Sequence, residues 1–194
     1  MLTDLPNILT LSRIAAIPVL VLLVALREPW GNLLAAILFT IAAITDYLDG
    51  MLAREMVLAS DFGRMLDPIA DKLLVGATLM ALVGFNHLPA YGIYPAIVIM
   101  LREILVSGLR EYLAEIRARL PVTRLAKWKT GFQMAALGLL LLGGGGGPVV
   151  GFGWLHPGLI GGALLWIAAG LTLITGWDYL MAGLQHVAAP RSGG

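Results

Sequence analysis

The sequence predicts an all-α integral membrane protein with six transmembrane helices. Of its 194 residues, 59% are hydrophobic and 13% are charged, and the mean hydropathy is +0.87. A soluble domain usually carries about 25% charged residues, and long charge-free runs separate the few charges of this chain. This composition argues against a soluble enzyme, a disordered segment and a nucleic-acid-binding protein, because each of these needs a more polar surface.

The chain contains no cysteine. Disulfide bonds, zinc thiolate sites and cysteine nucleophiles are therefore excluded. Because the length fits one domain, we expect a single membrane domain over residues 1–194.

The apolar runs define the predicted helices in order. These runs cover 14–26, 29–45, 73–101 and 130–177. A span needs about 20 mostly apolar residues. The third run is broken near Pro89, and the fourth by Gly143–Gly147, so each of these runs contains two helices. The glycines are expected to form a flexible turn. The six predicted spans are 8–26, 31–53, 67–86, 91–110, 127–143 and 157–178.

The first predicted span resembles a signal peptide only in its apolar run. It is preceded by Asp4 rather than by a basic stretch, and it contains Arg13 and Pro18 without an obvious cleavage site. We therefore expect it to be the first helix of the mature protein.

Basic residues predict the orientation of the chain. Arg27 is the single Lys or Arg in the connections that follow the first, third and fifth spans. The remaining basic residues lie on the other side or at the helix ends there. Because Lys and Arg are enriched in cytoplasmic segments, we expect both termini in the cytoplasm and the protein in the cell's inner (cytoplasmic) membrane.

Four aspartates gather at the predicted cytoplasmic ends of two neighbouring spans. Asp46 and Asp49 lie near the end of the second span, and Asp67 and Asp71 lie at the start of the third. Spacings of three and four residues place each pair on one helix face. The short connector makes the two helices antiparallel neighbours, so four carboxylates would repel one another unless cations neutralised them.

Two divalent cations would satisfy such a cluster. Carboxylate oxygens indicate Mg²⁺ or Mn²⁺ rather than zinc, and paired metal ions often assist displacement at phosphorus. One alternative is that some of the acids form ion pairs with Arg54, Arg64 or Lys72. Another is a cation channel or transporter, but transport sites usually lie near the bilayer midplane, whereas these acids lie at helix ends.

Small residues accompany the acids. Gly50, Ala53 and Gly63 leave the helix surface beside the aspartates without large side chains. A bulky ligand would thus be able to approach the helix backbone. The alternative is close packing between helices, which small residues also permit in membranes.

The segment from 46 to 71 resembles the signature of the CDP-alcohol phosphatidyltransferase family. It reads Asp46-x2-Asp49-Gly50-x2-Ala53-Arg54-x8-Gly63-x3-Asp67-x3-Asp71 and matches that signature at each fixed position. The family has a six-helix membrane core, which agrees with the hydropathy of this chain.

The resemblance implies roles for these residues. The four aspartates are implied as metal ligands, with Asp71 also the general base. Gly50, Ala53, Arg54 and Gly63 are implied to bind the cytidine and diphosphate of a CDP-linked lipid. An alcohol would attack the lipid-attached phosphorus and CMP would leave. The resemblance also implies a homodimer, and no nucleic-acid partner is expected.

Flanking segments point to one acceptor alcohol. LPNILTLSR, REILVSGLREYLAE and KWKTGFQM resemble the family members that use glycerol 3-phosphate. This resemblance implies CDP-diacylglycerol and glycerol 3-phosphate as substrates and phosphatidylglycerophosphate as product. Inositol phosphate, serine and phosphatidylglycerol are the alternative acceptors.

A phosphorylated acceptor needs cations near the metal site. Arg110, Lys127 and Lys129 lie at the cytoplasmic ends of the fourth and fifth spans, and Thr10 and Arg13 lie at the start of the first. We take these five residues as candidate ligands of the acceptor phosphate. For each basic residue the alternative is that it only sets the orientation of the chain.

Arg102 and Glu103 are adjacent within the fourth span. Neighbouring residues point in different directions on a helix. We therefore expect them to make separate contacts rather than a mutual ion pair.

Overall fold

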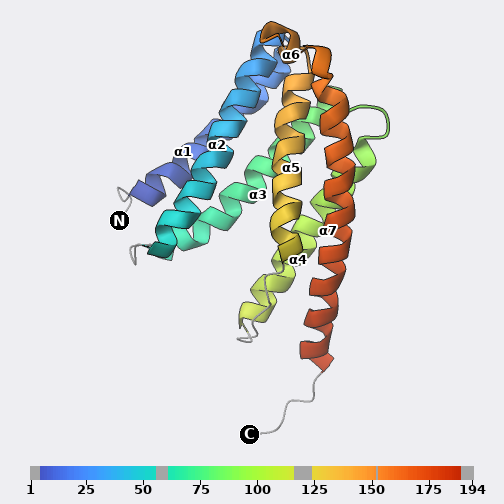
Figure 1. The fold of residues 1–194 in the computed structure, drawn as a ribbon. Coiled ribbons are helices and arrows are strands. Elements are labelled where there is room, and N and C mark those ends of the chain that lie inside the picture. Colours follow the sequence, from blue (N-terminus) through green and yellow to red (C-terminus); the bar gives the residue numbers. More distant parts are fainter. Residues whose placement is uncertain (1–4, 56–60, 116–123, 152, 189–194) are drawn as a thin grey trace, which may run out of the picture.

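The computed structural model describes residues 5–55, 61–115, 124–151 and 153–188, and within these ranges the side chains of 5–6, 47–55, 61–64, 115, 124, 153, 182 and 185–188 lie outside the description. The elements are α1 (Leu5–Ala25), α2 (Pro29–Glu55), α3 (Asp61–Gly84), α4 (Ile93–Glu115), α5 (Arg124–Gly143), α6 (Gly146–Val149), η1 (Gly153–Leu155) and α7 (Pro157–Ala188). Throughout the described residues the fold is helical and contains no strand (Figure 1).

Each predicted span falls on one long helix of the bundle. Helices α1, α3 and α5 run toward the end of the bundle that holds α6, and α2, α4 and α7 run away from it (Figure 1). The all-helical class predicted from the sequence is confirmed. The residues that end α2 and begin α3 consequently meet at the end of the bundle opposite α6.

Three helices are long and apolar enough to cross a membrane within the described residues: Asn7–Ala25 in α1, Pro29–Asp46 in α2 and Pro157–Met181 in α7. Helices α3, α4 and α5 are 20 to 24 residues long, and each carries three or more charged residues toward one end. These charges lower their hydropathy, and they belong to the segments from which the candidate site is built.

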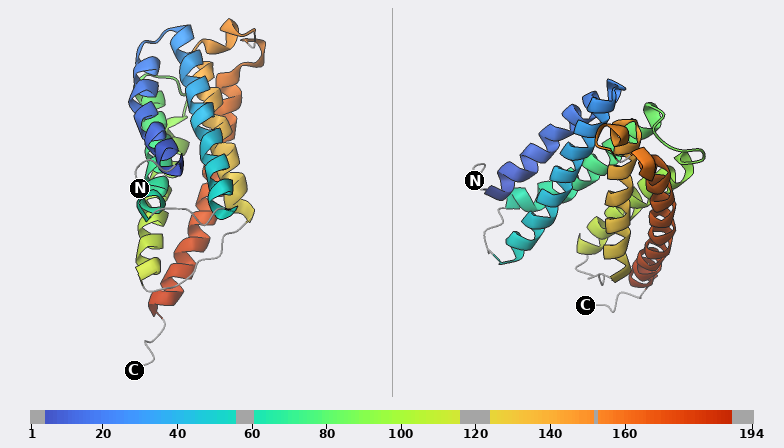
Figure 2. Two further views of the ribbon diagram at one scale, coloured as in Figure 1. Left: turned by 90° about the vertical axis from the view of Figure 1, so that its left-hand side faces the viewer. Right: turned by 45° about the horizontal axis from the view of Figure 1, so that its top comes forward.

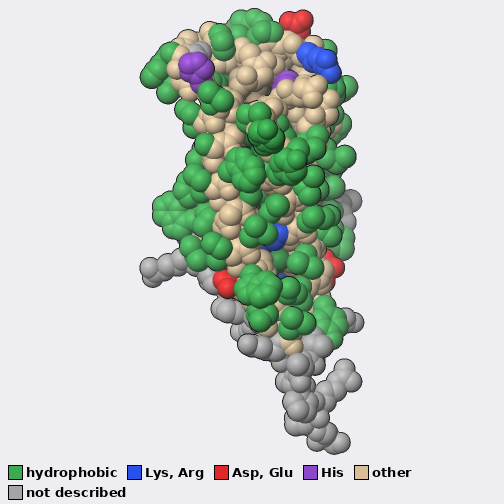
Figure 3. All heavy atoms as spheres, turned by 90° about the vertical axis from the view of Figure 1, so that its right-hand side faces the viewer, with side chains coloured by type: hydrophobic (Ala, Val, Ile, Leu, Met, Phe, Trp, Pro, Cys, Tyr) green, Lys and Arg blue, Asp and Glu red, His purple; other side chains and the backbone are tan. Residues whose placement is uncertain are grey.

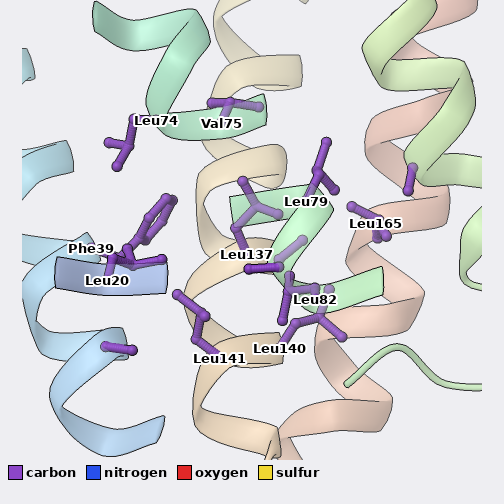
Figure 4. Close-up of a cluster of buried hydrophobic side chains, with 14 of the residues drawn as sticks. Leu20, Phe39, Leu74, Val75, Leu79, Leu82, Leu137, Leu140, Leu141 and Leu165 are labelled. Carbon is purple, nitrogen blue, oxygen red and sulfur yellow. The ribbon is translucent and has the colours of Figure 1, made fainter. Parts of the chain in front are cut away.

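The core is formed mainly by leucine and alanine side chains, with valine, isoleucine and phenylalanine, from the six long helices. Leu20 of α1, Phe39 of α2, Leu79 of α3, Leu137 of α5 and Leu165 of α7 are each 1% exposed or less. Figure 4 shows several of these side chains pointing toward one another between the helices. The most extensive contact joins α5 and α7, while α1 packs on α2 and α3, and α4 packs on α7.

Close packing of α5 on α7 depends on a glycine. A Cβ atom added to Gly161 would lie 2.9 Å from the backbone nitrogen of Leu140 and 3.0 Å from the carbonyl oxygen of Ala136. These contacts are shorter than a carbon atom tolerates. Small residues at such positions allow membrane helices to approach closely, and dispersion forces then hold them together.

The glycine run does not form the simple flexible turn expected from the sequence. Gly146 begins the short helix α6, and it is buried. A Cβ atom on Gly146 would lie 2.9 Å from the backbone nitrogen of Leu33 in α2. In addition, the Asn32 side-chain amide donates a hydrogen bond to the carbonyl oxygen of Gly144. The glycine run is therefore packed against the start of α2, and its glycines are needed for this close approach rather than for a loose turn.

The outer surface of the bundle is apolar over most of its length. Large side chains such as Leu22, Met80, Leu101 and Leu173 are more than half exposed. Figure 3 shows one face on which apolar side chains are spread over most of the length and charged ones are few. A soluble protein rarely exposes so much apolar surface, whereas a bilayer accommodates it.

Candidate active site

Helix α1 fixes two of the predicted site acids. Arg13, which is almost fully buried, lies 2.6 Å from Asp46 between its Nη1 and the Oδ1 of the carboxylate. One turn earlier, Thr10 donates a hydrogen bond to Asp67. Thus α1 joins the end of α2 to the start of α3, and each acid is held by a partner from a third helix.

Asp71 lies one turn after Asp67 on α3 and belongs to the same electrostatic environment. Its carboxylate interacts with the negative charges of Asp46 and Glu103 and with the positive charges of Arg13 and Lys129. The site therefore combines charges from α1 to α5. Charged side chains gathered within apolar helices of membrane length cost free energy, and they usually serve a function.

A long groove begins beside Asp46. It has a volume of about 1310 Å³ and runs along α2 from Leu33 to Asp46 and along α5 from Ala126 to Leu142. The ends of α2 and α5 that carry the charged residues diverge in Figure 1 and in the right-hand view of Figure 2. Most of the lining is apolar.

Thr40 of α2 is a polar residue partway along the groove, but the charged residues of the groove all lie at one end. Asp46, Arg110, Lys127 and Thr130 line it there, and the rest of its wall is made mostly of Ala, Ile, Leu and Met. The groove thus joins an apolar channel to a charged mouth. A ligand with an apolar tail and a charged headgroup fits this division.

The Arg110 side chain is oriented by α7. Its Nη2 donates a hydrogen bond of 2.9 Å to the Tyr179 hydroxyl, and its guanidinium carbon lies 5.0 Å from the centre of the Tyr179 ring. Arg102 also lies over this ring, at 5.6 Å, and donates to Thr175. Tyr179 and Thr175 are buried. Among the described residues, no carboxylate pairs with Arg110.

Lys129 is paired with an acid of α4. Its ammonium group donates to the carboxylate of Glu103, and Arg102 lies 3.6 Å from the same carboxylate oxygen. The expectation that Arg102 and Glu103 would not form a mutual ion pair is wrong, because Lys129 draws the Glu103 side chain to a position that Arg102 also reaches. Lys72 was one predicted ion-pair partner of the site aspartates, but among the described residues it pairs with none of them and donates to Ser107 instead.

Five residues of the signature lie outside the described side chains. Their positions fall on α2 and α3, and no contact is assigned to them: Asp49, Gly50, Ala53, Arg54 and Gly63. Without Asp49, the described acids do not form a group of three metal-ligating side chains close enough to hold an ion. The available donors are nevertheless carboxylate oxygens, which suit Mg²⁺ or Mn²⁺.

The structure adds residues that sequence reasoning missed. Tyr179 and Thr175 were not expected near the site, and Gln133 is buried beside Lys129 on α5. Each is a polar residue within an otherwise apolar membrane helix, which is the one signal that would have marked it. The arginine partners of Tyr179 and Thr175 lie on α4, so spacing along the chain gave no further indication.

A helical bundle with membrane-length apolar helices, a carboxylate cluster and an apolar groove beside it defines a membrane protein with a polar site at its helix ends. The family model for CDP-alcohol phosphatidyltransferase matches residues 3–174. The chain belongs to this family, and it is a transferase.

Several curated relatives carry one name, CDP-diacylglycerol–glycerol-3-phosphate 3-phosphatidyltransferase. A protein of Rickettsia bellii is 47% identical over 179 residues, covering 92% of this chain and 94% of its own length. The Cereibacter sphaeroides protein is 40% identical, with coverage of 95% and 97%. The Bacillus subtilis protein is 39% identical, with coverage of 91% and 93%.

Proposed function

We propose that this protein transfers the phosphatidyl group of CDP-diacylglycerol to glycerol 3-phosphate, giving phosphatidylglycerophosphate and CMP. The observation that carries the proposal is the groove between α2 and α5, because its charged mouth lies at Asp46 and its apolar length suits lipid tails. The names of the relatives, which cover nearly the whole chain, support the same donor and acceptor.

The dimensions of the groove support a lipid donor. The groove follows α2 over the 14 residues from Leu33 to Asp46, and a helix rises about 1.5 Å per residue, giving a length of about 20 Å. One leaflet contributes about half of a hydrocarbon core that is about 30 Å thick. An acyl chain can therefore lie along the groove while its headgroup remains at the charged mouth.

The residues of the site divide the chemistry among them. Asp71 accepts the proton of the attacking hydroxyl, since an alcohol is a weak nucleophile until it loses that proton. Arg110 and Lys127 at the mouth of the groove bind the phosphate of the acceptor, and Lys129 contributes positive charge from its place beside Glu103. Gly50, Ala53, Arg54 and Gly63 bind the CDP-lipid.

Thr10 and Arg13 bind the acceptor phosphate less directly than the sequence led us to expect. Each is already in contact with a site acid, Asp67 and Asp46 respectively. We assign them to holding these acids in place, with contact to the acceptor phosphate a secondary role. Their substitution would thus disturb the carboxylates as well as the acceptor.

Divalent cations complete the proposed site. Asp46, Asp49, Asp67 and Asp71 would hold Mg²⁺ or Mn²⁺, two ions in all. When bound, such ions offset the negative charge of the diphosphate and of the departing CMP. The described acids come from the facing ends of α2 and α3, a donor set that suits this role.

The membrane arrangement follows from the helix directions and the basic residues. We propose six spans, both termini in the cytoplasm, and a site that faces the cytoplasm in an inner membrane. We also propose a homodimer, which rests on the family resemblance. Cross-linking of the protein in native membranes would test the dimer.

The reaction is tested with purified protein in lipid vesicles. CDP-diacylglycerol and Mg²⁺ are supplied with labelled glycerol 3-phosphate, inositol phosphate, serine or phosphatidylglycerol in separate reactions. We expect a lipid product and CMP with glycerol 3-phosphate, no product after EDTA treatment, and recovery with excess Mg²⁺ or Mn²⁺. Product with another acceptor alone would overturn the proposed acceptor, and full activity in EDTA would overturn the metal-assisted mechanism.

A further inference from the structure

Tyr179 of α7 holds the side chain of Arg110 at the groove mouth. Among the described basic residues there, Arg110 is the one that has a hydrogen-bond partner but no acid partner. Arg110 lines the groove beside Asp46 and Lys127. Its hydrogen bond goes to the Tyr179 hydroxyl, at 2.9 Å, and its guanidinium lies over the Tyr179 ring. Tyr179 itself is only 4% exposed, so its ring cannot turn freely.

Two other cations of the site are paired with an acid instead. Arg102 lies near the Glu103 carboxylate, and Lys129 donates to the same carboxylate. A hydroxyl and a ring face orient a guanidinium without cancelling its charge. The positive charge of Arg110 is therefore oriented by Tyr179 but is not paired with an acid among the described residues, which suits binding of a phosphate from solution.

We propose that Tyr179 is a positioning residue that aims Arg110 at the phosphate of the acceptor. The inference rests on the proposed function and extends it to a residue of α7 outside the family signature. Tyr179 does not touch the reacting atoms. It acts through Arg110, and its effect should be confined to acceptor binding.

The test compares the kinetics of Tyr179→Phe with those of the wild-type protein. This variant keeps the ring and its packing but removes the hydroxyl that accepts the hydrogen bond. We expect KM for glycerol 3-phosphate to rise about tenfold, the usual effect of losing a hydrogen bond to a charged group. The kcat value, KM for CDP-diacylglycerol and thermal stability should remain near wild type. Tyr112→Phe, at an exposed position on α4, is the matched control.

A double-variant cycle separates positioning from a structural role. In an Arg110→Gln background, Tyr179→Phe should have no further effect on KM, because the residue it positions is gone. An additive effect, a loss shared equally by all kinetic parameters, or an unchanged KM would overturn the proposal. A rise confined to KM for CDP-diacylglycerol would do so too, since Arg110 would then serve the lipid diphosphate.

The outcome of this test can be distinguished from the outcome of the test of the proposed function. If the wild-type protein uses inositol phosphate instead, the proposed acceptor fails, and the same comparison with that acceptor still tests Tyr179. If the acceptor carries no phosphate, both proposals are overturned.

Discussion

At the scale of single residues, the candidate site is a set of charges held by partners from different helices. Arg13 holds Asp46, and Thr10 holds Asp67. Both partners are buried on α1, so the acids keep defined positions without depending on solvent. This arrangement limits the repulsion among carboxylates that a cluster of this kind otherwise suffers.

Asp71 is the residue whose loss should most affect chemistry. Asp71→Asn keeps the size of the side chain but removes the proton acceptor and a metal-ligand charge. We expect kcat to fall by about 100-fold or more, measured as CMP release from CDP-diacylglycerol with saturating acceptor. Asp178→Asn, at an exposed position on α7, is the control and should retain activity. Near-normal turnover in the Asp71 variant would exclude it as the base.

Glu103 should matter for stability. It faces two cations, Lys129 and Arg102, whose side chains are 6% and 10% exposed. Removing the shared acid leaves these charges uncompensated, so Glu103→Gln should lower stability by about 3 kcal/mol. Thermal unfolding in detergent measures this change, with Glu111→Gln on the exposed side of α4 as control.

A compensating variant sharpens that prediction. Replacing Lys129 with Met in the Glu103→Gln background removes one of the unpaired cations and should restore part of the lost melting temperature. If the two changes were simply additive, the buried charge pair would not be the source of the effect.

At the scale of helices, the sequence predicts where elements lie but not how tightly they meet. Charge-free runs predicted spans at 31–53 and 157–178, and the helices cover Pro29–Glu55 and Pro157–Ala188. The packed form of the glycine run was missed because its neighbours, such as Asn32 and Leu33, belong to α2. Contacts between residues more than 100 positions apart leave no local pattern.

The same limit applied to the site. The acid spacing predicted that Asp46, Asp67 and Asp71 lie on the neighbouring ends of two helices, because it follows helical periodicity. The partners Tyr179 and Glu103 depend on how α4 meets α5 and α7, which periodicity does not specify.

The contact between α5 and α7 can be tested at its glycine. Gly161→Ala places a methyl group against the α5 backbone and should lower stability by about 1–3 kcal/mol, seen as a lower melting temperature in detergent. Gly170 on the same helix has no neighbouring atom within 4 Å of its added Cβ. Gly170→Ala is therefore the matched control and should be neutral or stabilising. Equal melting temperatures in the two variants would refute the packing argument.

At the scale of the whole molecule, the direction of each helix decides which ends face the same side. The end that carries the acids also carries most of the basic residues, and the end with α6 carries Arg27. A membrane protein whose basic residues are concentrated at one end should insert with that end in the cytoplasm.

The absence of cysteine makes this topology directly measurable. Val150 and Leu125 are exposed at opposite ends of the bundle, at 42% and 43%. In intact cells, a membrane-impermeant maleimide should label Val150→Cys but label Leu125→Cys only after the membrane is opened. The reverse pattern would place the acid site on the outer side.

The groove between α2 and α5 runs along the helices rather than ending in a closed chamber. One substrate therefore arrives by lateral diffusion within a leaflet, whereas the other arrives from the aqueous phase. For the lipid, the relevant concentration is its mole fraction in the surrounding surface rather than its amount per volume. Dilution with inert phospholipid at constant bulk concentration should thus slow the reaction, although no molecule of substrate has been removed from the vessel.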